Sequence, residues 1–284
     1  MFPYILLLAS GLRAQLPQNP SPLKDTTREH SRIEEQQVSG QRVNLLPLGS
    51  LLIPSGLRPT ILVIHFHSSP WLVELAARKR FPSAAVLAVN LGAGSDVYKD
   101  PFSDPARFAR LLDESEKACN CKYRTVILSA FSAGYGAIRE ILKEPSNWDR
   151  ISSIVLADSL YAGYGKETDD LAPFLGYLKA GKRLVITHSE LYPGTYTATF
   201  EAADWLLGKM ATKRHAVLKW GPIGMQQLSE TSVGNFLVMG FAGNTADDHV
   251  DHLFALDRWY GLALPPPPPR PVNRPPTAPR PVKK

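Results

Sequence analysis

The stretch Thr125-Val-Ile-Leu-Ser-Ala-Phe-Ser-Ala-Gly-Tyr-Gly136 decides the expected fold. Its first half is a mostly apolar, β-rich run, which is typical of a strand buried on both faces. Its second half turns into a helical pattern, and Ser132 lies in the turn. A serine there needs small neighbours such as Ala130 and Gly134, because the backbone is strained and packs closely against the sheet. We interpret Ser132 as a candidate nucleophile; a turn serine without a chemical role is the alternative.

Apolar runs of the same kind recur along the chain. They lie at residues 61–66, 84–89, 125–129, 151–157, 183–187 and 235–240. Helical patterns lie between them, at residues 70–80, 103–117, 134–143, 169–180 and 197–210. This alternation predicts an α/β fold, with a mostly parallel central sheet and helices on both faces. Ligands of such sheets bind outside the carboxyl ends of the strands, so functional side chains are expected just after each run.

The strand, turn and helix around Ser132 resemble the α/β-hydrolase family, whose nucleophile lies in a G-x-S-x-G turn. Here the motif has Ala130 in place of the first glycine, followed by Ser132 and Gly134. The resemblance covers residues 45–262 and identifies no subfamily. It implies a three-layer α/β sandwich and a serine hydrolase with a catalytic triad.

The resemblance also implies an oxyanion hole near the end of the run at residues 61–66. His67-Ser68 resembles the His-Gly of the family at this place, with serine instead of glycine. The backbone N–H of Ser68 or Ser69 would then act with that of Ala133, the residue after the nucleophile. Two fixed donors of this kind stabilise the oxyanion of an acyl-transfer transition state.

The general base is expected after the last strand. Two histidines, His249 and His252, stand between the run at residues 235–240 and an apolar helix. Histidine suits this role because its ordinary pKa, near 6.5, lets it take and return a proton at neutral pH. We favour His249, which is nearer the loop and the start of the helix, and keep His252 as the alternative.

Two acids compete to orient the histidine. Asp158 directly follows the run at residues 151–157, whereas Glu190 follows the next run, at the position more usual in the family. We rank Asp158 first because it abuts a strand without an intervening loop. Either residue could instead bind substrate or cap a helix.

Aromatic residues after the predicted strands suggest a substrate pocket. The segments Tyr161-Ala-Gly-Tyr164 and Tyr192-Pro-Gly-Thr-Tyr196 combine rings with glycines, as in a site that stacks a sugar or an aromatic acyl group. Ordinary turns would account for the Ala-Gly and Pro-Gly pairs equally well. The residues that we predict to contact substrate are His67, Tyr135, Tyr161 and Tyr192.

The function expected from these residues is hydrolysis of an ester, rather than an amide, through an acyl-enzyme on Ser132. No cofactor is expected, because no nucleotide-binding glycine loop follows a first strand. One alternative is a metal-dependent hydrolase, since His65, His67, His188 and Asp158 at strand ends resemble the zinc ligands of amidohydrolase barrels. The other is a non-catalytic binding protein on a hydrolase fold.

The two ends of the chain differ from its middle. Residues 1–14 carry an apolar stretch too short to span a bilayer, with an alanine before Gln15, and are predicted to be a signal peptide for export to the periplasm or beyond. Residues 15–40 are predicted to be a flexible leader, and residues 41–263 the hydrolase-like domain. Residues 264–284 form a proline-rich basic tail, which could contact an envelope surface.

The charge of the chain argues against some partners, and its cysteines argue against a disulfide framework. The formal net charge is +6, and removing the five cationic residues of the tail leaves +1. We therefore expect no nucleic-acid partner, and no integral membrane segment in the mature chain. Cys119 and Cys121 are the only cysteines, and we predict two thiols beside a strand, because a bridge between residues so close would be strained.

Overall fold

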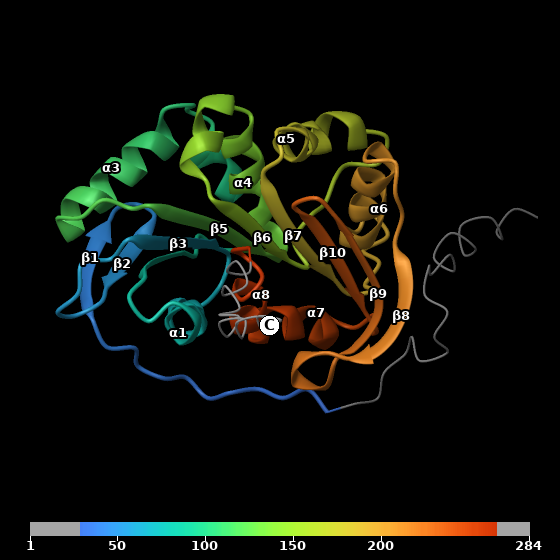
Figure 1. Cartoon of the computed structure of the whole chain (residues 1–284), viewed down its shortest axis with the longest axis horizontal. Coiled ribbons are helices and arrows are strands. Elements are labelled where there is room, and N and C mark those ends of the chain that lie inside the picture. The colour runs from blue at the N-terminus through green and yellow to red at the C-terminus, as the bar shows by residue number, and fades with distance from the viewer. Residues whose placement is uncertain (1–28, 266–284) are drawn as a thin grey trace, which may run out of the picture.

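The computed structural model describes residues 29–265, which form one ten-stranded sheet with helices on both sides (Figure 1). The order of the strands is β1-β2-β4-β3-β5-β6-β7-β10-β9-β8. The predicted signal peptide, residues 15–28 of the leader and residues 266–284 of the tail lie outside the described residues.

The six central strands are parallel and almost wholly buried. Their continuous apolar runs are explained by this burial, because helices cover both faces of this part of the sheet. The predicted α/β class with a mostly parallel sheet is therefore confirmed. The strands are β3 (Ile61–Phe66), β4 (Ala85–Val89), β5 (Thr125–Phe131), β6 (Ser153–Ala157), β7 (Arg183–His188) and β10 (Phe236–Phe241).

Antiparallel strands, which the sequence did not predict, extend both edges of the sheet. β1 (Gln41–Leu45) and β2 (Gly49–Ile53) lie beyond β4, and β9 (Gln226–Val233) and β8 (His215–Trp220) lie beyond β10. In β8, five of the six side chains are exposed. An edge strand that faces solvent needs no continuous apolar run, and so it leaves a weak signal in the sequence.

Two layers of helices enclose the sheet, as predicted. α3 to α6 cover one face, and α1 and α8, with α7 beside them, cover the other (Figure 1). Each face has its own buried apolar cluster, which stabilises the layer by removing apolar surface from water. The helices are α1 (Pro70–Arg80), α2 (Asp96–Lys99), α3 (Arg107–Cys119), α4 (Tyr135–Leu142), α5 (Glu167–Lys179), α6 (Thr199–Lys209), α7 (Ala246–Phe254) and α8 (Leu256–Tyr260).

The described N-terminal segment, residues 29–39, contains no helix or strand and runs along the base of the molecule (Figure 1). It is attached to α7 through the buried carboxylate of Asp251. His30 Nδ1 lies 2.9 Å from Asp251 Oδ2, and the guanidinium of Arg32 forms an ion pair with the same carboxylate. Arg32 also stacks 4.9 Å above the ring of Phe254. These contacts fix the segment against the helix that carries His249.

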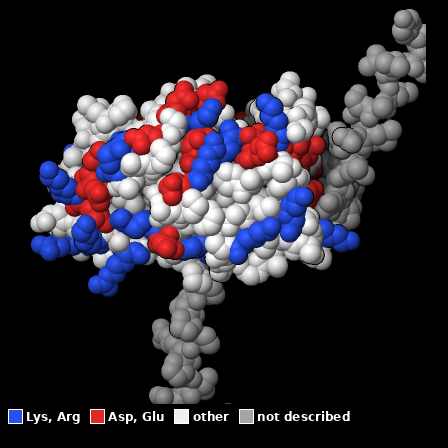
Figure 2. Space-filling view, turned by 90° about the horizontal axis from the view of Figure 1, so that it is seen from above, with Lys and Arg blue, Asp and Glu red and all other residues white. Residues whose placement is uncertain are grey.

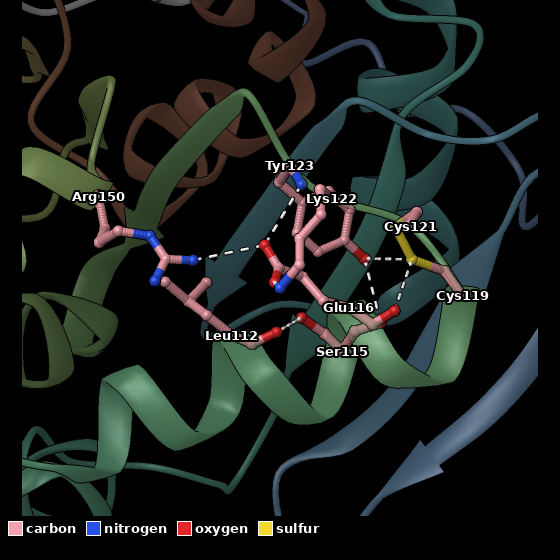
Figure 3. Close-up of a disulfide and its surroundings, with 8 residues drawn as sticks. All are labelled: Leu112, Ser115, Glu116, Cys119, Cys121, Lys122, Tyr123 and Arg150. Atoms are coloured by element: carbon pink, nitrogen blue, oxygen red, sulfur yellow. Dashed lines mark hydrogen bonds and ion pairs between the residues drawn. A yellow bond between two sulfur atoms is a disulfide. The ribbon is translucent and has the colours of Figure 1, made fainter.

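A disulfide joins Cys119 and Cys121 at the end of α3 (Figure 3). The prediction of two free thiols was therefore wrong. Asn120, between the cysteines, has a left-handed backbone with φ of +47°, which ends the helix and brings the two Cα atoms to 5.2 Å. That separation is ordinary for a disulfide. The Tyr123 hydroxyl lies 3.4 Å from the Cys119 sulfur.

Charge is mixed on the face of the molecule that Figure 2 shows, where basic and acidic side chains alternate. No single-sign patch of the kind that binds nucleic acid is seen on that face. Within residues 29–265, no helix is both long enough and apolar enough to cross a bilayer.

Candidate active site

A cavity of about 560 Å³ opens at the carboxyl ends of the neighbouring strands β3 and β5. The chain leaves β3 toward β4 on one side and leaves β5 toward β6 on the other, so the two loops diverge. Such a switch point is where open α/β sheets bind their ligands. The cavity is lined by His67, Ala93, Gly94, Ser95, Asp96, Ser132, Ala133, Tyr135, Tyr161, Ala162, Gly163 and Tyr196.

Ser132 lies at the base of this cavity, in a sharp turn between β5 and α4. Its φ of +47° is in the left-handed region, which costs a residue with a side chain about 1–3 kcal/mol. Gly134 is required in the same turn, since a Cβ there would lie 2.2 Å from the Phe66 carbonyl oxygen. The Ser159 hydroxyl donates a 2.7 Å hydrogen bond to the Ser132 carbonyl oxygen. Close packing and this bond hold the turn in its strained form.

Asp158 and His249 meet beside this turn, although 91 positions separate them in the chain. Asp158 directly follows β6 and is 3% exposed, and His249 lies in the first turns of α7. His249 Nδ1 is 2.8 Å from Asp158 Oδ2. The imidazole also stacks on the ring of Phe131, which precedes Ser132. The structure therefore pairs the predicted base with the predicted acid, and it packs the base on the residue that precedes the predicted nucleophile.

The chain order serine, aspartate, histidine, with the serine in a strained turn between strand and helix, is that of the α/β-hydrolases. The switch point and the mostly parallel sheet complete the pattern. The chain has the α/β-hydrolase fold. Within that fold, Ser132 lies in the turn after β5, Asp158 follows the next strand, and His249 follows the last parallel strand, β10.

No protein-family model matches this chain, and no curated protein is significantly similar to it in sequence. Several solved structures have a similar backbone fold. One is an acetyl xylan esterase from Aspergillus awamori, which is 12% identical, has a TM-score of 0.45, and aligns with 80% of this chain and 100% of its own. Poly(aspartic acid) hydrolase-1 from Sphingomonas sp. KT-1 has 13% identity and a TM-score of 0.46 over 78% and 98%. A glucuronoyl esterase from Solibacter usitatus has 13% identity and a TM-score of 0.39 over 74% and 76%.

The carboxylate of Asp158 is held ionised in the α/β-hydrolase site. Burial alone would raise its pKa, but the adjacent His249 lowers it by charge and by hydrogen bonding, and the net pKa is well below the ordinary value. The Ser189 hydroxyl donates a further 2.5 Å hydrogen bond to the same oxygen, Oδ2. An ionised carboxylate in this place favours the tautomer of His249 that carries its proton on Nδ1.

Glu190, the alternative acid, lies elsewhere. Its carboxylate forms an ion pair with the buried guanidinium of Arg214, at 3.7 Å, and its backbone N–H donates to the Gly243 carbonyl oxygen at 2.8 Å. Arg214 in turn makes two 2.8 Å bonds to Asp204. Glu190 therefore belongs to a charge network with Arg214 and Asp204. Its backbone N–H joins the loop after β7 to the loop before α7.

His252, the alternative base, is fully buried. Its Nδ1 lies 2.7 Å from the Thr187 hydroxyl, and its ring packs between Phe241 and Trp259. Three positions apart on α7, His249 therefore contacts Asp158 and Phe131, whereas His252 lies in the core.

The residues of the metal alternative do not converge on one point. His65 Nδ1 is 2.7 Å from the Ser129 hydroxyl, His67 Nδ1 is 2.7 Å from the Tyr98 hydroxyl, and His188 Nε2 is 3.2 Å from Arg214. Burial lowers the pKa of His65 and of His188 to about 3, so both are neutral at physiological pH. Each histidine serves a separate hydrogen-bonding network, which argues against the barrel-like zinc site.

The predicted oxyanion donors follow the two strand ends. Ala133 lines the cavity, whereas Ser68 and Ser69 stand at the start of α1 and do not line it. His67 has a φ of +72°, and its N–H is already bonded to the Val89 carbonyl oxygen at 2.9 Å. This turn leads the chain from β3 into α1 at the edge of the site.

Of the predicted substrate contacts, His67, Tyr135 and Tyr161 line the cavity. Tyr192 does not; it is 40% exposed, and its hydroxyl accepts a 2.8 Å hydrogen bond from Tyr164. This placement corrects the prediction that Tyr192 lines the pocket itself.

Several residues of the site escaped the sequence analysis. Asp96 lines the cavity, and Ser159 and Ser189 bond to the turn at Ser132 and to Asp158. Tyr196, from a segment that was expected to line a pocket, lines the cavity too. Ser189 directly follows β7, and Ser159 lies two positions after the end of β6. Their place at the carboxyl ends of buried strands was the sequence signal that could have identified them. Asp96 begins α2, in the connection between β4 and α3, and the sequence does not show that this connection runs beside the cavity.

Proposed function

We propose that this chain is a serine hydrolase that cleaves carboxylic esters, and amides less readily, through an acyl-enzyme on Ser132. The observation that carries the proposal is the 2.8 Å contact of Asp158 with His249, beside a strained serine at the switch point of an α/β-hydrolase sheet. In such a triad, the acid orients the imidazole, and the imidazole takes the proton of the hydroxyl, which turns a weak nucleophile into a strong one.

In the first half-reaction, His249 Nε2 takes the proton of the Ser132 hydroxyl as Oγ attacks the ester carbonyl carbon. Asp158 keeps the imidazole in the required tautomer and stabilises the imidazolium that forms. The tetrahedral intermediate then collapses, the bond to the leaving oxygen breaks, and that oxygen takes the proton from His249. The alcohol departs, and the acyl group stays on Ser132.

In the second half-reaction, water replaces the alcohol and the same proton path runs again. His249 takes a proton from water, the hydroxyl attacks the acyl carbon, and Ser132 leaves with the proton restored. The backbone N–H of Ala133, with that of Ser68 or Ser69, is proposed to stabilise the negative oxygen in both halves. Loss of one such donor costs roughly 3–4 kcal/mol in related holes, which makes this hole a large part of the rate.

We further propose that residues 41–263 are the catalytic domain of an exported protein, with residues 1–14 as the signal peptide. The disulfide of Cys119 and Cys121 supports export, because such bonds persist in oxidising compartments and are rare in the cytosol.

The test is turnover of p-nitrophenyl acetate and butyrate by the purified protein, with Ser132→Ala, His249→Gln and His252→Gln as variants. We expect loss of nearly all activity in the first two, whereas His252→Gln keeps the chemistry but unfolds more easily. A fluorophosphonate probe is expected to label the wild type and not Ser132→Ala. Activity lost in EDTA but kept in Ser132→Ala would overturn the proposal, and absence of both turnover and labelling would favour a binding protein.

A further inference from the structure

Four tyrosines stand as two pairs on the two loops beside the cavity. Tyr161 lines the cavity, and its ring meets that of Tyr196 edge to face, with centroids 5.3 Å apart. Tyr164 and Tyr192 form the second pair and do not line the cavity. Tyr164, Tyr192 and Tyr196 are each 40–47% exposed, so their rings are open to a ligand. We call these four residues the tyrosine surface.

The tyrosine surface is held in place by bonds between the two loops that carry it. Residues 158–166 follow β6, and residues 189–198 follow β7. The Thr197 N–H donates to the Ala162 carbonyl oxygen at 2.8 Å in an isolated β-bridge, and the Tyr164 hydroxyl donates to that of Tyr192 at 2.8 Å. Rings fixed in this way lose little conformational freedom when a ligand stacks on them.

The charges around the tyrosine surface select against anionic ligands. Asp96 is the one charged residue that lines the cavity, and no Lys or Arg lines it. Burial and the Tyr192 hydroxyl raise the pKa of Tyr164, and the negative charges of Glu201 and Glu167 raise it further. Lys166 is the only basic residue of the two loops. Arg139, which lies 5.3 Å over the ring of Tyr135, is paired with Asp170, so Asp96, Glu167 and Glu201 outnumber the basic Lys166 here and disfavour a polyanion.

The wall of the cavity is mixed in character, with polar groups set among apolar ones. Ser95, Asp96, His67 and Ser132 supply the polar groups of this wall, which a ligand with hydroxyl groups could match. Exposed tyrosine rings with polar hydroxyl ends suit a ligand with both apolar faces and many hydroxyl groups. A chain of neutral sugars has that combination.

We propose that the tyrosine surface binds the sugar chain of a neutral polysaccharide that carries ester groups, and so delivers an ester on that chain to Ser132. This inference rests on the proposed function for the cleavage step, but the binding step can be measured alone. Sugar rings stack on Tyr164, Tyr192 and Tyr196, and Tyr161 continues the stack into the cavity.

The experiment compares acetylated xylan, a neutral polymer, with p-nitrophenyl acetate, a small ester. The variants are Tyr164→Ala, Tyr192→Ala and the double variant, with Tyr164→Phe to keep the ring and remove the hydroxyl. The control is Trp220→Ala, which removes a 74% exposed ring on the edge strand β8, remote from the cavity. We expect KM for the polymer to rise roughly three- to ten-fold in each alanine variant, and less for Tyr164→Phe.

The ratio of polymer to small-ester activity is the decisive readout. We expect this ratio to fall in the tyrosine variants and to stay constant in Trp220→Ala. Equal losses on both esters, or an unchanged KM for the polymer, would overturn the inference.

Binding of deacetylated xylan to Ser132→Ala separates this inference from the proposed function. Weaker binding when Tyr164 and Tyr192 are also replaced supports the tyrosine surface even if the wild type hydrolyses neither ester. Turnover of the small ester without any binding of xylan would leave the serine hydrolase intact and refute the sugar site.

Discussion

The imidazole of His249 stacks on the ring of Phe131, with centroids 4.4 Å apart and an angle of 29° between the planes. Phe131 is the last residue of β5, and Ser132 follows it directly. The proposed base is thus packed against the strand that presents the proposed nucleophile, while Asp158 holds its other side. Packing and hydrogen bonding together leave the ring little freedom to leave the site.

The two candidate acids give opposite predictions. Asp158→Asn keeps the shape of the site but removes the charge that fixes the tautomer of His249, and we expect kcat to fall roughly 10³- to 10⁴-fold. Glu190→Gln changes a residue paired with Arg214, so most of the esterase activity should remain. Steady-state kinetics on p-nitrophenyl butyrate check both. The reverse pattern would assign the acid to Glu190.

Two glycines provide a matched pair for the turn at Ser132. A methyl group at Gly134 would meet the Phe66 carbonyl oxygen, so Gly134→Ala should destabilise the protein by about 1–3 kcal/mol and displace Ser132. Gly208 is exposed in α6 and has open space around it. Gly208→Ala should therefore stabilise by up to about 1 kcal/mol with activity unchanged. Chemical denaturation would measure the change in the free energy of unfolding for both variants. A Gly134→Ala variant with unchanged stability and activity would contradict the packing argument.

Stability should fall with acid before the proposed active site loses its charge. The folded pKa of His65 and of His188 is about 3, below the unfolded value near 6.5, because burial disfavours the charged form. Between these values the unfolded state binds more protons, so stability rises with pH by up to about 1.4 kcal/mol per unit for each histidine. Asp158 has a lowered pKa, so its contribution is complete above its unfolded value and is lost only as pH falls toward its folded one.

Unfolding in urea at pH 4 to 7 tests this pH dependence. The slope of stability against pH should decrease in His65→Gln, provided that variant folds, and in His188→Gln. His215→Gln on β8 is the control, because its imidazole is exposed and its loss removes no buried group. An unchanged slope in both buried variants would contradict the assignment.

The disulfide should contribute little to stability. It closes a loop with one intervening residue, Asn120, and so constrains the unfolded chain only slightly, which the loop-entropy model puts at about 1–2 kcal/mol. We expect the double variant Cys119→Ser, Cys121→Ser to fold and to lose a few degrees in Tm at most. Thermal unfolding with and without reductant measures this, and a large loss would mean that the end of α3 depends on the bridge.

The central sheet could be predicted because burial on both faces imposes a direct rule on sequence. β3 has the predicted bounds, and α1 does too, since Pro70 begins it. β8 could not be predicted, because most of its side chains face solvent and so form no apolar run. α3 begins at Arg107 rather than at Ser103, because short turns around Pro101 and Pro105 precede it.

In the candidate site too, local features could be predicted from the sequence, and contacts between distant segments could not. The turn at Ser132 is local, so spacing and small neighbours indicated it. The choice between Asp158 and Glu190 is not local, since it depends on which strand end faces α7 across the sheet. The segment with Tyr196 was expected to line a pocket, but its pairing with residue 162 was not expected. Contacts between distant segments leave no pattern that a single sequence can display.

The last parallel strand, β10, enters the middle of the sheet, between β7 and β9, and not its edge. A growing chain therefore holds the proposed nucleophile and acid long before the proposed base is made, since His249 comes 117 positions after Ser132. Any product truncated before α7 would be chemically silent. Premature hydrolysis during synthesis is thereby avoided without an inhibitor, because order of emergence alone withholds the final component.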